Sequence, residues 1–154
     1  MRYGTGANAV SALEGIDLSI ADREFVTIVG PSGCGKSTLL YLVGGFLRAS
    51  AGSVLLRGAP ITGPGPDRGI VFQRYSLFPW LTVRGNIGYG LDEKGVPRAE
   101  RDRIIAEHVK LVHLEGFEDR YPRELSGGMQ QRVALAQTLA CQPDILLMDA
   151  PFGA

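Results

Sequence analysis

The residues whose types and spacing most clearly suggest a chemical role form a glycine-rich stretch at positions 30–37, Gly-Pro-Ser-Gly-Cys-Gly-Lys-Ser. Its glycines let backbone N–H groups converge on phosphate oxygens, and the positive end of a following helix favours the same anion. Lys36 is placed to reach the β and γ phosphates of a nucleotide, and the Ser37 hydroxyl suits magnesium, which takes oxygen ligands. The stretch predicts a phosphate-binding loop, with a plain glycine-rich turn as the alternative.

Two further segments carry polar groups in suggestive positions. Asp149 ends an apolar run at 145–148, where a phosphate-loop enzyme places a second magnesium-directed carboxylate, although a lone aspartate there is more often a turn former or helix cap. Residues 125–132 read Leu-Ser-Gly-Gly-Met-Gln-Gln-Arg. Ser126 is a good helix N-cap, but a cap leaves the two glycines unexplained, since glycines in a first turn weaken a helix. A helix N-terminus with a hydroxyl is a second anion site.

The elements that must position these residues follow from the hydrophobic pattern. Residues 16–20 alternate apolar and polar as a half-buried strand does, and end at a polar turn at 22–24. Residues 25–29 form a β-branched run without a polar face, which is typical of a strand covered on both sides. The glycine-rich loop then opens a helix from about 36 to 47. Strand, loop and helix in this order predict an α/β unit.

The rest of the chain continues this alternation. Residues 54–57, 70–72 and 144–149 are predicted strands, and the last of them is predicted to be buried. A helix is predicted over 98–114, and a second follows Ser126 and stops at Pro143. The expected buried faces of these helices are Ile104, Ile105, Val109, Leu111 and Val112 in the first and Met129, Val133, Ala136 and Ala140 in the second.

Composition narrows the class of protein. Glycine accounts for 21 of 154 residues, about twice its usual share, and the 45% hydrophobic content is enough for a core. Sixteen basic and sixteen acidic residues balance, so no nucleic-acid footprint is visible. The longest apolar run, 39–47, is too short to span a membrane, and no secretory signal is apparent. Cys34 and Cys141 have no disulfide or metal-ligand spacing, which fits a reducing cytoplasm.

With its Leu-Ser-Gly-Gly-x-Gln segment followed by Arg, the sequence resembles the ATP-binding subunits of ABC transporters. Phe72 and Gln73 match the family's Q-loop, whose Gln contacts magnesium and senses the transmembrane subunit. Residues 77–83, followed by Asn86, resemble the nitrate, sulfonate and taurine importer branch. Tyr3 stands where the family has an aromatic that stacks on adenine; a frayed or packed terminal residue is the alternative.

The resemblance implies an α/β fold: a P-loop NTPase core of the ABC ATPase type with an N-terminal antiparallel β portion and a helical subdomain. It implies one ATP-binding domain over 1–154, with 1–72 and 134–154 in the ATPase core and 73–133 forming the Q-loop, helical subdomain and signature motif. Relatives continue through further strands and helices to a histidine at the γ-phosphate. We therefore expect a fragment whose sheet lacks its middle strand and exposes apolar faces; an independently folded short form is the alternative.

The resemblance also implies the site, with ATP and Mg²⁺ as cofactors. Nucleotide contacts are implied for Tyr3, Gly30, Pro31, Ser32, Gly33, Cys34, Gly35, Lys36, Ser37, Thr38, Ser126, Gly127, Gly128 and Gln130. Magnesium is implied at Ser37, Gln73 and Asp149. Catalytic roles are implied for Lys36, Gln73 and Asp149, and for Ser126 acting in trans on the nucleotide of a second copy.

The resemblance implies a homodimer of ATP-binding subunits that binds transmembrane permease subunits at the cytoplasmic face of the bacterial inner membrane. It implies a solute-binding protein as an indirect partner, and no nucleic acid. Phe78 and Trp80 are either core residues or a docking surface for the membrane partner. His108 and His113 are expected on helix surfaces.

One departure bears on activity: Ala150 occupies the position of the family's catalytic Glu. An Ala methyl neither accepts a proton nor orients water, so ATP binding with weak or absent hydrolysis is expected. A non-hydrolysing nucleotide-binding module is therefore one alternative to an importer motor. A soluble ABC ATPase of DNA repair or translation is another, although repair types carry a long coiled coil that is missing between Gln73 and Ser126. A small-molecule kinase is a third, disfavoured by the signature segment.

Overall fold

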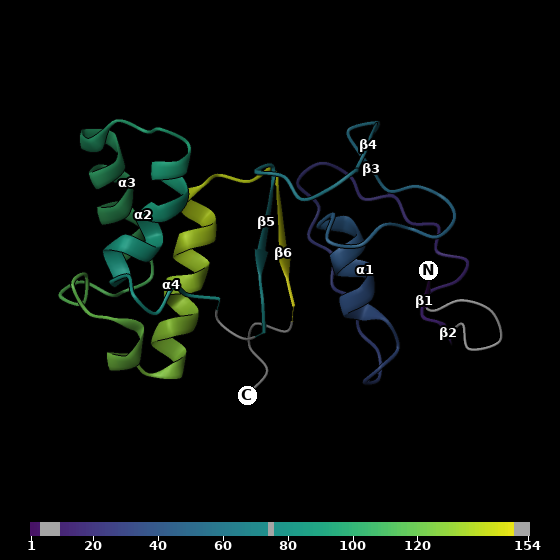
Figure 1. The fold of residues 1–154 in the computed structure, drawn as a ribbon, viewed down its shortest axis with the longest axis horizontal. Coiled ribbons are helices and arrows are strands. Elements are labelled where there is room, and N and C mark those ends of the chain that lie inside the picture. The colour runs from purple at the N-terminus through teal and green to yellow at the C-terminus, as the bar shows by residue number, and fades with distance from the viewer. Residues whose placement is uncertain (4–9, 74–75, 150–154) are drawn as a thin grey trace. The chain divides into compact units, whose positions relative to one another are not determined.

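The computed structural model describes residues 1–3, 10–73 and 76–149 (Figure 1). Two compact units divide the chain, Met1–Gly65 and Pro66–Ala154, and each is considered by itself. The expected division into an ATPase core and a helical subdomain stays a prediction.

In its described residues, the first unit contains two short antiparallel strand pairs and one helix. Strand β1 (Arg2–Tyr3) pairs with β2 (Val10–Ser11), and β3 (Leu55–Leu56) pairs with β4 (Ala59–Pro60). The expected antiparallel portion is therefore present, and β3 lies within the strand predicted over 54–57. All four strands contain only two residues.

Helix α1 (Lys36–Val43) follows the glycine-rich loop as predicted but ends four residues earlier than expected. Gly44 caps it, and Gly45 turns the chain with φ of +78°. A Cβ at Gly45 would collide with the Gly63 carbonyl, so this close approach requires glycine. The apolar residues beyond Val43 therefore belong to a turn.

The predicted strands at 16–20 and 25–29 are wrong for this structure. Within the described part of the unit, no strand ladder includes either segment, although the turn between them forms, with Glu24 N–H donating to the Ala21 carbonyl at 3.2 Å. A strand exists only where a neighbour satisfies its backbone groups, whatever its own β propensity. The apolar side chains of 25–29 are exposed and not covered on both sides as their pattern predicts: Phe25 is 82% exposed and Val29 87%.

The second unit is built on two parallel strands, β5 (Arg68–Val71) and β6 (Ile145–Met148). Their register pairs Val71 with Met148, and β6 is half-buried, not fully buried as predicted. Three helices and one 3₁₀ turn connect the two strands: α2 (Val83–Glu93), α3 (Arg98–Leu111), η2 (Pro122–Glu124) and α4 (Gly127–Ala140).

Helix α4 packs on β5 at Gly69, where a Cβ would lie 2.8 Å from the Pro143 ring and collide with the Thr138 methyl. Glycine is therefore required where the strand and helix approach. Pro143 itself follows the end of α4, as predicted.

The core of the second unit lies between its three helices. The predicted faces of α3 and α4 are confirmed: Ile105, Val109, Val133 and Ala136 are at most 2% exposed. Leu111, predicted on the same stripe, is 62% exposed, because the last turn of α3 directs it away from the other helices.

Helix α2 was not predicted, because its 11 residues include three glycines, which lower helix propensity by about 1 kcal/mol each relative to alanine. Packing explains two of them. A Cβ at Gly88 would lie 2.8 Å from the Ile105 side chain, and one at Gly90 would collide with the Cys141 sulfur. Among the described helices, none is long and apolar enough to cross a bilayer.

Candidate functional site

The glycine-rich loop adopts a conformation that depends on glycine. Gly33 and Gly35 have φ of +79° and +96°, and Gly35 is the N-cap of α1. A Cβ at Gly35 would lie 2.7 Å from the Ala12 carbonyl oxygen and from a Leu13 methyl carbon. The loop therefore turns sharply while its backbone runs against the segment that follows β2, and any larger residue would force the two apart.

Lys36 is the first residue of α1, and its side chain is bonded to this loop. Its ammonium donates to the carbonyl oxygens of Gly30 at 2.9 Å and Pro31 at 2.8 Å, and it lies 3.7 Å from the Cys34 sulfur. No side chain caps α1 and its first turn contains no acidic residue. The helix therefore presents the positive end of its dipole beside a lysine ammonium, which suits a polyphosphate.

The strand that contains Tyr3 is connected to the glycine-rich loop through backbone hydrogen bonds and the residues after β2. It lies in β1 opposite Val10, and the two residues after β2, Ala12 and Leu13, donate their N–H groups to the Met1 carbonyl at 3.0 and 3.2 Å. The same two residues contact Gly35. The hairpin that carries Tyr3 thus leads directly to the phosphate loop; its adenine contact stays a prediction.

Gln73 and Asp149 are brought to one edge of the second unit. Asp149 follows β6, and its N–H donates to the Val71 carbonyl at 3.0 Å, at the carboxyl end of β5. Gln73 is exposed two residues beyond that carbonyl, and Asp149 is half-buried. Because parallel strands end at the same edge of a sheet, these two predicted magnesium ligands leave the sheet side by side.

Ser126 caps α4 as predicted: its hydroxyl oxygen accepts from the Met129 N–H at 3.3 Å. Gly127 and Gly128 follow, both exposed. A Cβ at Gly128 would meet nothing within 4 Å among the described residues, and Gly128 is helical, so neither its backbone conformation nor packing within the described chain requires glycine. The open surface at this helix N-terminus is the feature that an approaching ligand would use.

Gln130, one turn further along α4, points its amide inward. Its Nε2 donates to the carbonyl oxygens of Pro122 at 3.0 Å and Leu125 at 3.2 Å. These bonds fasten η2 and the residue before Ser126 to the helix. In this structure the Gln130 amide nitrogen therefore supports the signature segment, and a nucleotide contact by Gln130 stays a prediction.

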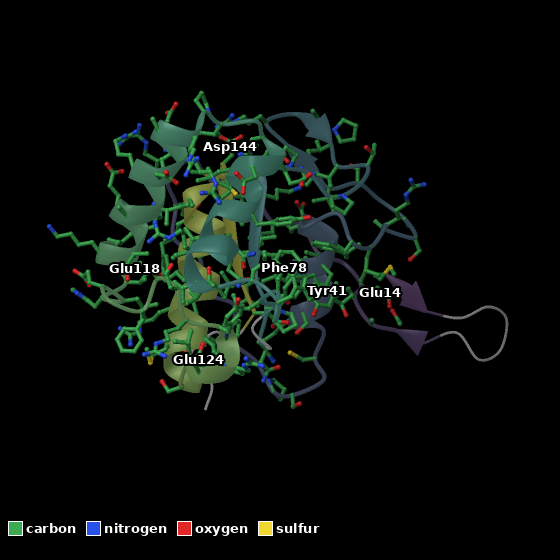
Figure 2. The ribbon with its side chains drawn as sticks, turned by 60° about the vertical axis from the view of Figure 1, so that its left-hand side comes forward. Glu14, Tyr41, Phe78, Glu118, Glu124 and Asp144 are labelled. Carbon is green, nitrogen blue, oxygen red and sulfur yellow. The ribbon has the colours of Figure 1, made fainter. Side chains whose placement is uncertain are left out.

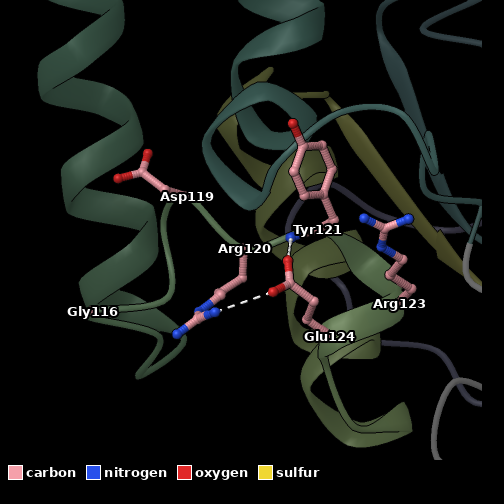
Figure 3. A pocket seen from close by; sticks show the side chains of 6 residues that line it. All are labelled: Gly116, Asp119, Arg120, Tyr121, Arg123 and Glu124. Atoms are coloured by element: carbon pink, nitrogen blue, oxygen red, sulfur yellow. Dashed lines mark hydrogen bonds and ion pairs between the residues drawn. The ribbon is translucent and has the colours of Figure 1, made fainter.

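The segment that leads into the signature is held by charge as well. Glu124 accepts from the Tyr121 N–H at 2.7 Å and from Arg120 at 3.1 Å, as the dashed lines in Figure 3 show. These bonds favour the ionised carboxylate, the Tyr121 N–H first, and lower the pKa of Glu124 below its ordinary value of 4.5. The residues lining this hollow of about 460 Å³ are Gly116, Asp119, Arg120, Tyr121, Arg123 and Glu124.

The exposure of the aromatic residues in the loop before α2 shows which of them are core residues. Trp80 is 69% exposed, so it is not a core residue. Phe78, which is labelled in Figure 2, is half-buried. The centroid of its ring lies 4.5 Å from that of Tyr89 and 5.5 Å from that of Trp80. Ala150 lies outside the described residues. His113 is exposed as expected, but His108 is half-buried, with Nδ1 2.8 Å from the Ile104 carbonyl oxygen.

Two supports of the site were not predicted from sequence. Glu124 follows Tyr121 at the spacing of a capping box, but tyrosine is not a usual first member of that motif, so its sequence signal is weak. Asn86 follows the importer-like segment at 77–83 and is completely buried. The sequence does not indicate that Asn86 is buried, because it is a polar residue in a segment of low helix propensity.

We expect the hydrogen bonds from the Tyr121 N–H and Arg120 to the Glu124 carboxylate to weaken at low pH. Because the folded-state pKa lies below the unfolded one, its stabilisation is present above about pH 4.5 and is lost as pH falls through the lower, folded value. The amide proton resonance of Tyr121 should titrate with a midpoint below 4.5. A midpoint at or above 4.5, or an unchanged titration in Arg120→Ala, would contradict this.

Comparison with known proteins adds to this geometry. A family model described as ABC transporter matches residues 13–153. An uncharacterized ABC transporter ATP-binding protein of Methanocaldococcus jannaschii is 55% identical over 147 residues, 96% of this chain and 55% of that protein. The nitrate import ATP-binding protein NrtD of Synechocystis is 52% identical over 146 residues, 95% of this chain and 55% of that protein. The bicarbonate transport ATP-binding protein CmpC of Synechococcus elongatus is 54% identical over 152 residues, 97% of this chain and 23% of that protein.

Two solved structures share the fold. A dimeric bacterial ABC transporter cassette is 37% identical with a TM-score of 0.89, and a dimeric post-hydrolysis cassette bound to ADP and Pi is 36% identical with a TM-score of 0.88. Each comparison covers 99% of this chain and 72% of the solved one. The chain thus spans little more than half the length of the first curated relative and 72% of these cassettes. The predicted ABC ATPase fold and the likeness to nitrate importers are confirmed: the chain belongs to the ABC transporter family of ATP-binding proteins.

Proposed function

We propose that this chain is the nucleotide-binding part of the motor subunit of a bacterial importer, which couples the binding and hydrolysis of ATP to uptake of a solute. The observation that carries the proposal is the loop around Lys36, whose ammonium is held on the loop that leads into α1, a helix start without a side-chain cap among the described residues. The names of NrtD and CmpC suggest a small anion such as nitrate or bicarbonate as the solute.

Within the first unit, each part of the loop has a role toward ATP. The amides at the start of α1 and the Lys36 ammonium hold the phosphates, while the hairpin that carries Tyr3 leads to the loop from the side where we place the base. Mg²⁺ would be held by Ser37, Gln73 and Asp149, whose oxygen atoms suit a hard cation. When bound, the ion supplies positive charge to the phosphates during their hydrolysis.

We place the signature segment on the nucleotide of a second copy. Both solved structures, which are of one related cassette, are dimeric, and the surface at Gly128 is open in this chain. Ser126 would meet the γ-phosphate held by Lys36 of the partner, and each protomer alone would contain half of each site. The dimer would sit on permease subunits at the cytoplasmic face of the membrane, supplied by a solute-binding protein.

Replacing Lys36 by alanine should weaken binding of Mg-ATP at least tenfold, which corresponds to about 1.4 kcal/mol, because the main point charge toward the phosphates is lost. Isothermal titration of the protein with Mg-ATP measures this. Lys110→Ala, which removes an exposed lysine from α3, is the matched control and should bind as the unmodified protein does. Absence of heat with the unmodified protein would refute nucleotide binding itself.

Gly128→Ala separates a ligand role from a packing role. The added methyl meets open space, and alanine favours a helix by about 1 kcal/mol, so the free energy of unfolding should stay equal or rise. ATP-dependent dimerisation, measured by light scattering, should weaken at least tenfold because the methyl occupies the place of the phosphate. Gly63→Ala, at another open glycine, should leave dimerisation unchanged. Normal dimerisation of Gly128→Ala would contradict the trans arrangement.

The second candidate function is a nucleotide-binding module that does not hydrolyse ATP, and Ala150 is the residue that favours it. If hydrolysis lacks only a general base, Ala150→Glu should raise phosphate release by roughly 100 to 10,000-fold. Release rates of the two proteins at saturating Mg-ATP decide this. Equal rates would mean that the absence of a carboxylate at position 150 does not limit turnover.

A further inference from the structure

We infer that Arg132 is a positioning residue for Ser126: it bonds the end of α3 to α4 and so fixes the loop 114–125, at whose end Ser126 is presented to the nucleotide of a second copy. The inference rests on the proposed function, because it needs two copies that share a nucleotide. Every contact that supports it lies within the second unit.

The side chain of Arg132 is directed at backbone carbonyls. Arg132 lies in the second turn of α4 and is half-buried. Its Nη1 donates to the carbonyl oxygen of Val112 at 2.9 Å and to that of His113 at 3.2 Å. Among the described residues, no carboxylate forms an ion pair with Arg132. Val112 and His113 directly follow α3, where the negative end of the helix dipole favours a cation.

The end of α3 that Arg132 holds has a costly backbone conformation. His113 has φ of +54°, in the left-handed region that favours glycine at this position of a helix end. The Leu114 N–H nevertheless donates to the Val109 carbonyl at 3.0 Å, the long bond of a Schellman motif, and Leu114 is buried in the core at 1% exposure. Because Arg132 bonds the peptide groups on both sides of His113, it stabilises the conformation that directs the chain into the loop.

Arg132 differs from the other loop-holding side chains in the length of chain that it spans. Asn86 in α2 and Gln130 in α4 donate to carbonyl oxygens between four and eight residues before them. Arg132 reaches carbonyls 19 and 20 residues before it. The loop 114–125 therefore has its start attached to α4 by Arg132 and its end attached by Gln130. Without Arg132, only the end stays attached.

This attachment matters for a ligand contact because the loop ends directly at Ser126. A displacement of about 1 Å is enough to weaken a contact that depends on orientation by tenfold or more. The Ser126 hydroxyl, in the position we propose, has to meet a phosphate on another protein chain. A loop fixed at both ends keeps that hydroxyl in one place before the second copy arrives, so less ordering is needed on association.

The inference is tested on the full-length subunit with Arg132→Met, which keeps an aliphatic stem but removes both hydrogen bonds. Mg-ATP-dependent dimerisation, measured by light scattering, should weaken at least tenfold. The dissociation constant for Mg-ATP, titrated at concentrations where the subunit is monomeric, should change less than twofold. Lys94→Met is the matched control, because Lys94 donates in the same way to the Cys141 carbonyl, at 2.6 Å, at the other end of α4. It should leave dimerisation unchanged.

Two readouts separate positioning from a general loss of stability. Hydrogen exchange at the Leu114 amide should accelerate at least tenfold in Arg132→Met, because the bond to Val109 opens more often. Adding His113→Gly to Arg132→Met should restore at least threefold of the lost dimerisation, since glycine adopts the left-handed conformation without help from Arg132. In the unmodified background, His113→Gly should change dimerisation less than twofold.

A second variant covers the case in which Arg132→Met does not fold. His113→Val changes an exposed residue and leaves Arg132 in place, but a β-branched residue rarely adopts positive φ. It should weaken dimerisation at least threefold with unchanged Mg-ATP binding. Normal dimerisation of His113→Val would overturn the inference.

Three further results would also overturn it: normal dimerisation of Arg132→Met, an equal loss in Lys94→Met, or no recovery on adding His113→Gly. If the unmodified subunit binds Mg-ATP but never dimerises, the proposed sharing of a nucleotide fails and the inference fails with it. If the unmodified subunit dimerises with Mg-ATP and Arg132→Met does so equally well, only the role of Arg132 is refuted.

Discussion

The parallel pairing of β5 with β6 is the constraint on which the second unit depends. Parallel neighbours cannot be joined by a tight turn, so the chain must leave β5, cross over and return to begin β6 at the same end. The whole helical bundle is contained in that crossover, and α4 must pack on β5 to bring the chain back. The same pairing brings Gln73 and Asp149, which are far apart in sequence, to one edge of the sheet.

Hydrogen bonds to backbone then connect the crossover from one end to the other. The first N–H groups of α2, at Val83 and Arg84, donate to the carbonyl oxygens of Arg120 and Glu118 at 2.8 and 2.9 Å. The segment that receives them continues through η2 to Ser126. The aromatic loop and the signature serine are therefore attached to the two sides of one hydrogen-bonded junction, although they are separated by two helices in sequence.

Sequence patterns predicted the parts of the chain in which local and tertiary preferences agree. The apolar periodicity of α3 and α4, the glycine spacing that precedes α1 and the short apolar run of β6 each predicted an element that is present. The segments at 16–20 and 25–29 have equally strong β patterns but no ladder within the described residues, because pairing depends on a neighbour that pattern cannot supply. Helix α2 shows the opposite case: its three glycines suggest a loop, but the segment is helical, and Gly88 and Gly90 lie close to Ile105 and Cys141. For the site, residue types and spacing predicted Lys36, Ser126 and Asp149, whereas Asn86 and Glu124 act through bonds that only the folded chain reveals.

The two hydrogen bonds from Lys36 to backbone carbonyls mean that nucleotide binding would exchange one set of acceptors for another. The Lys36 ammonium is held by the carbonyl oxygens of the loop's own backbone, at Gly30 and Pro31. An arriving phosphate would then replace acceptors that are already in place, so the net affinity would be a difference between two sets of bonds. Such an exchange would bring the energies of the free and the occupied loop close together.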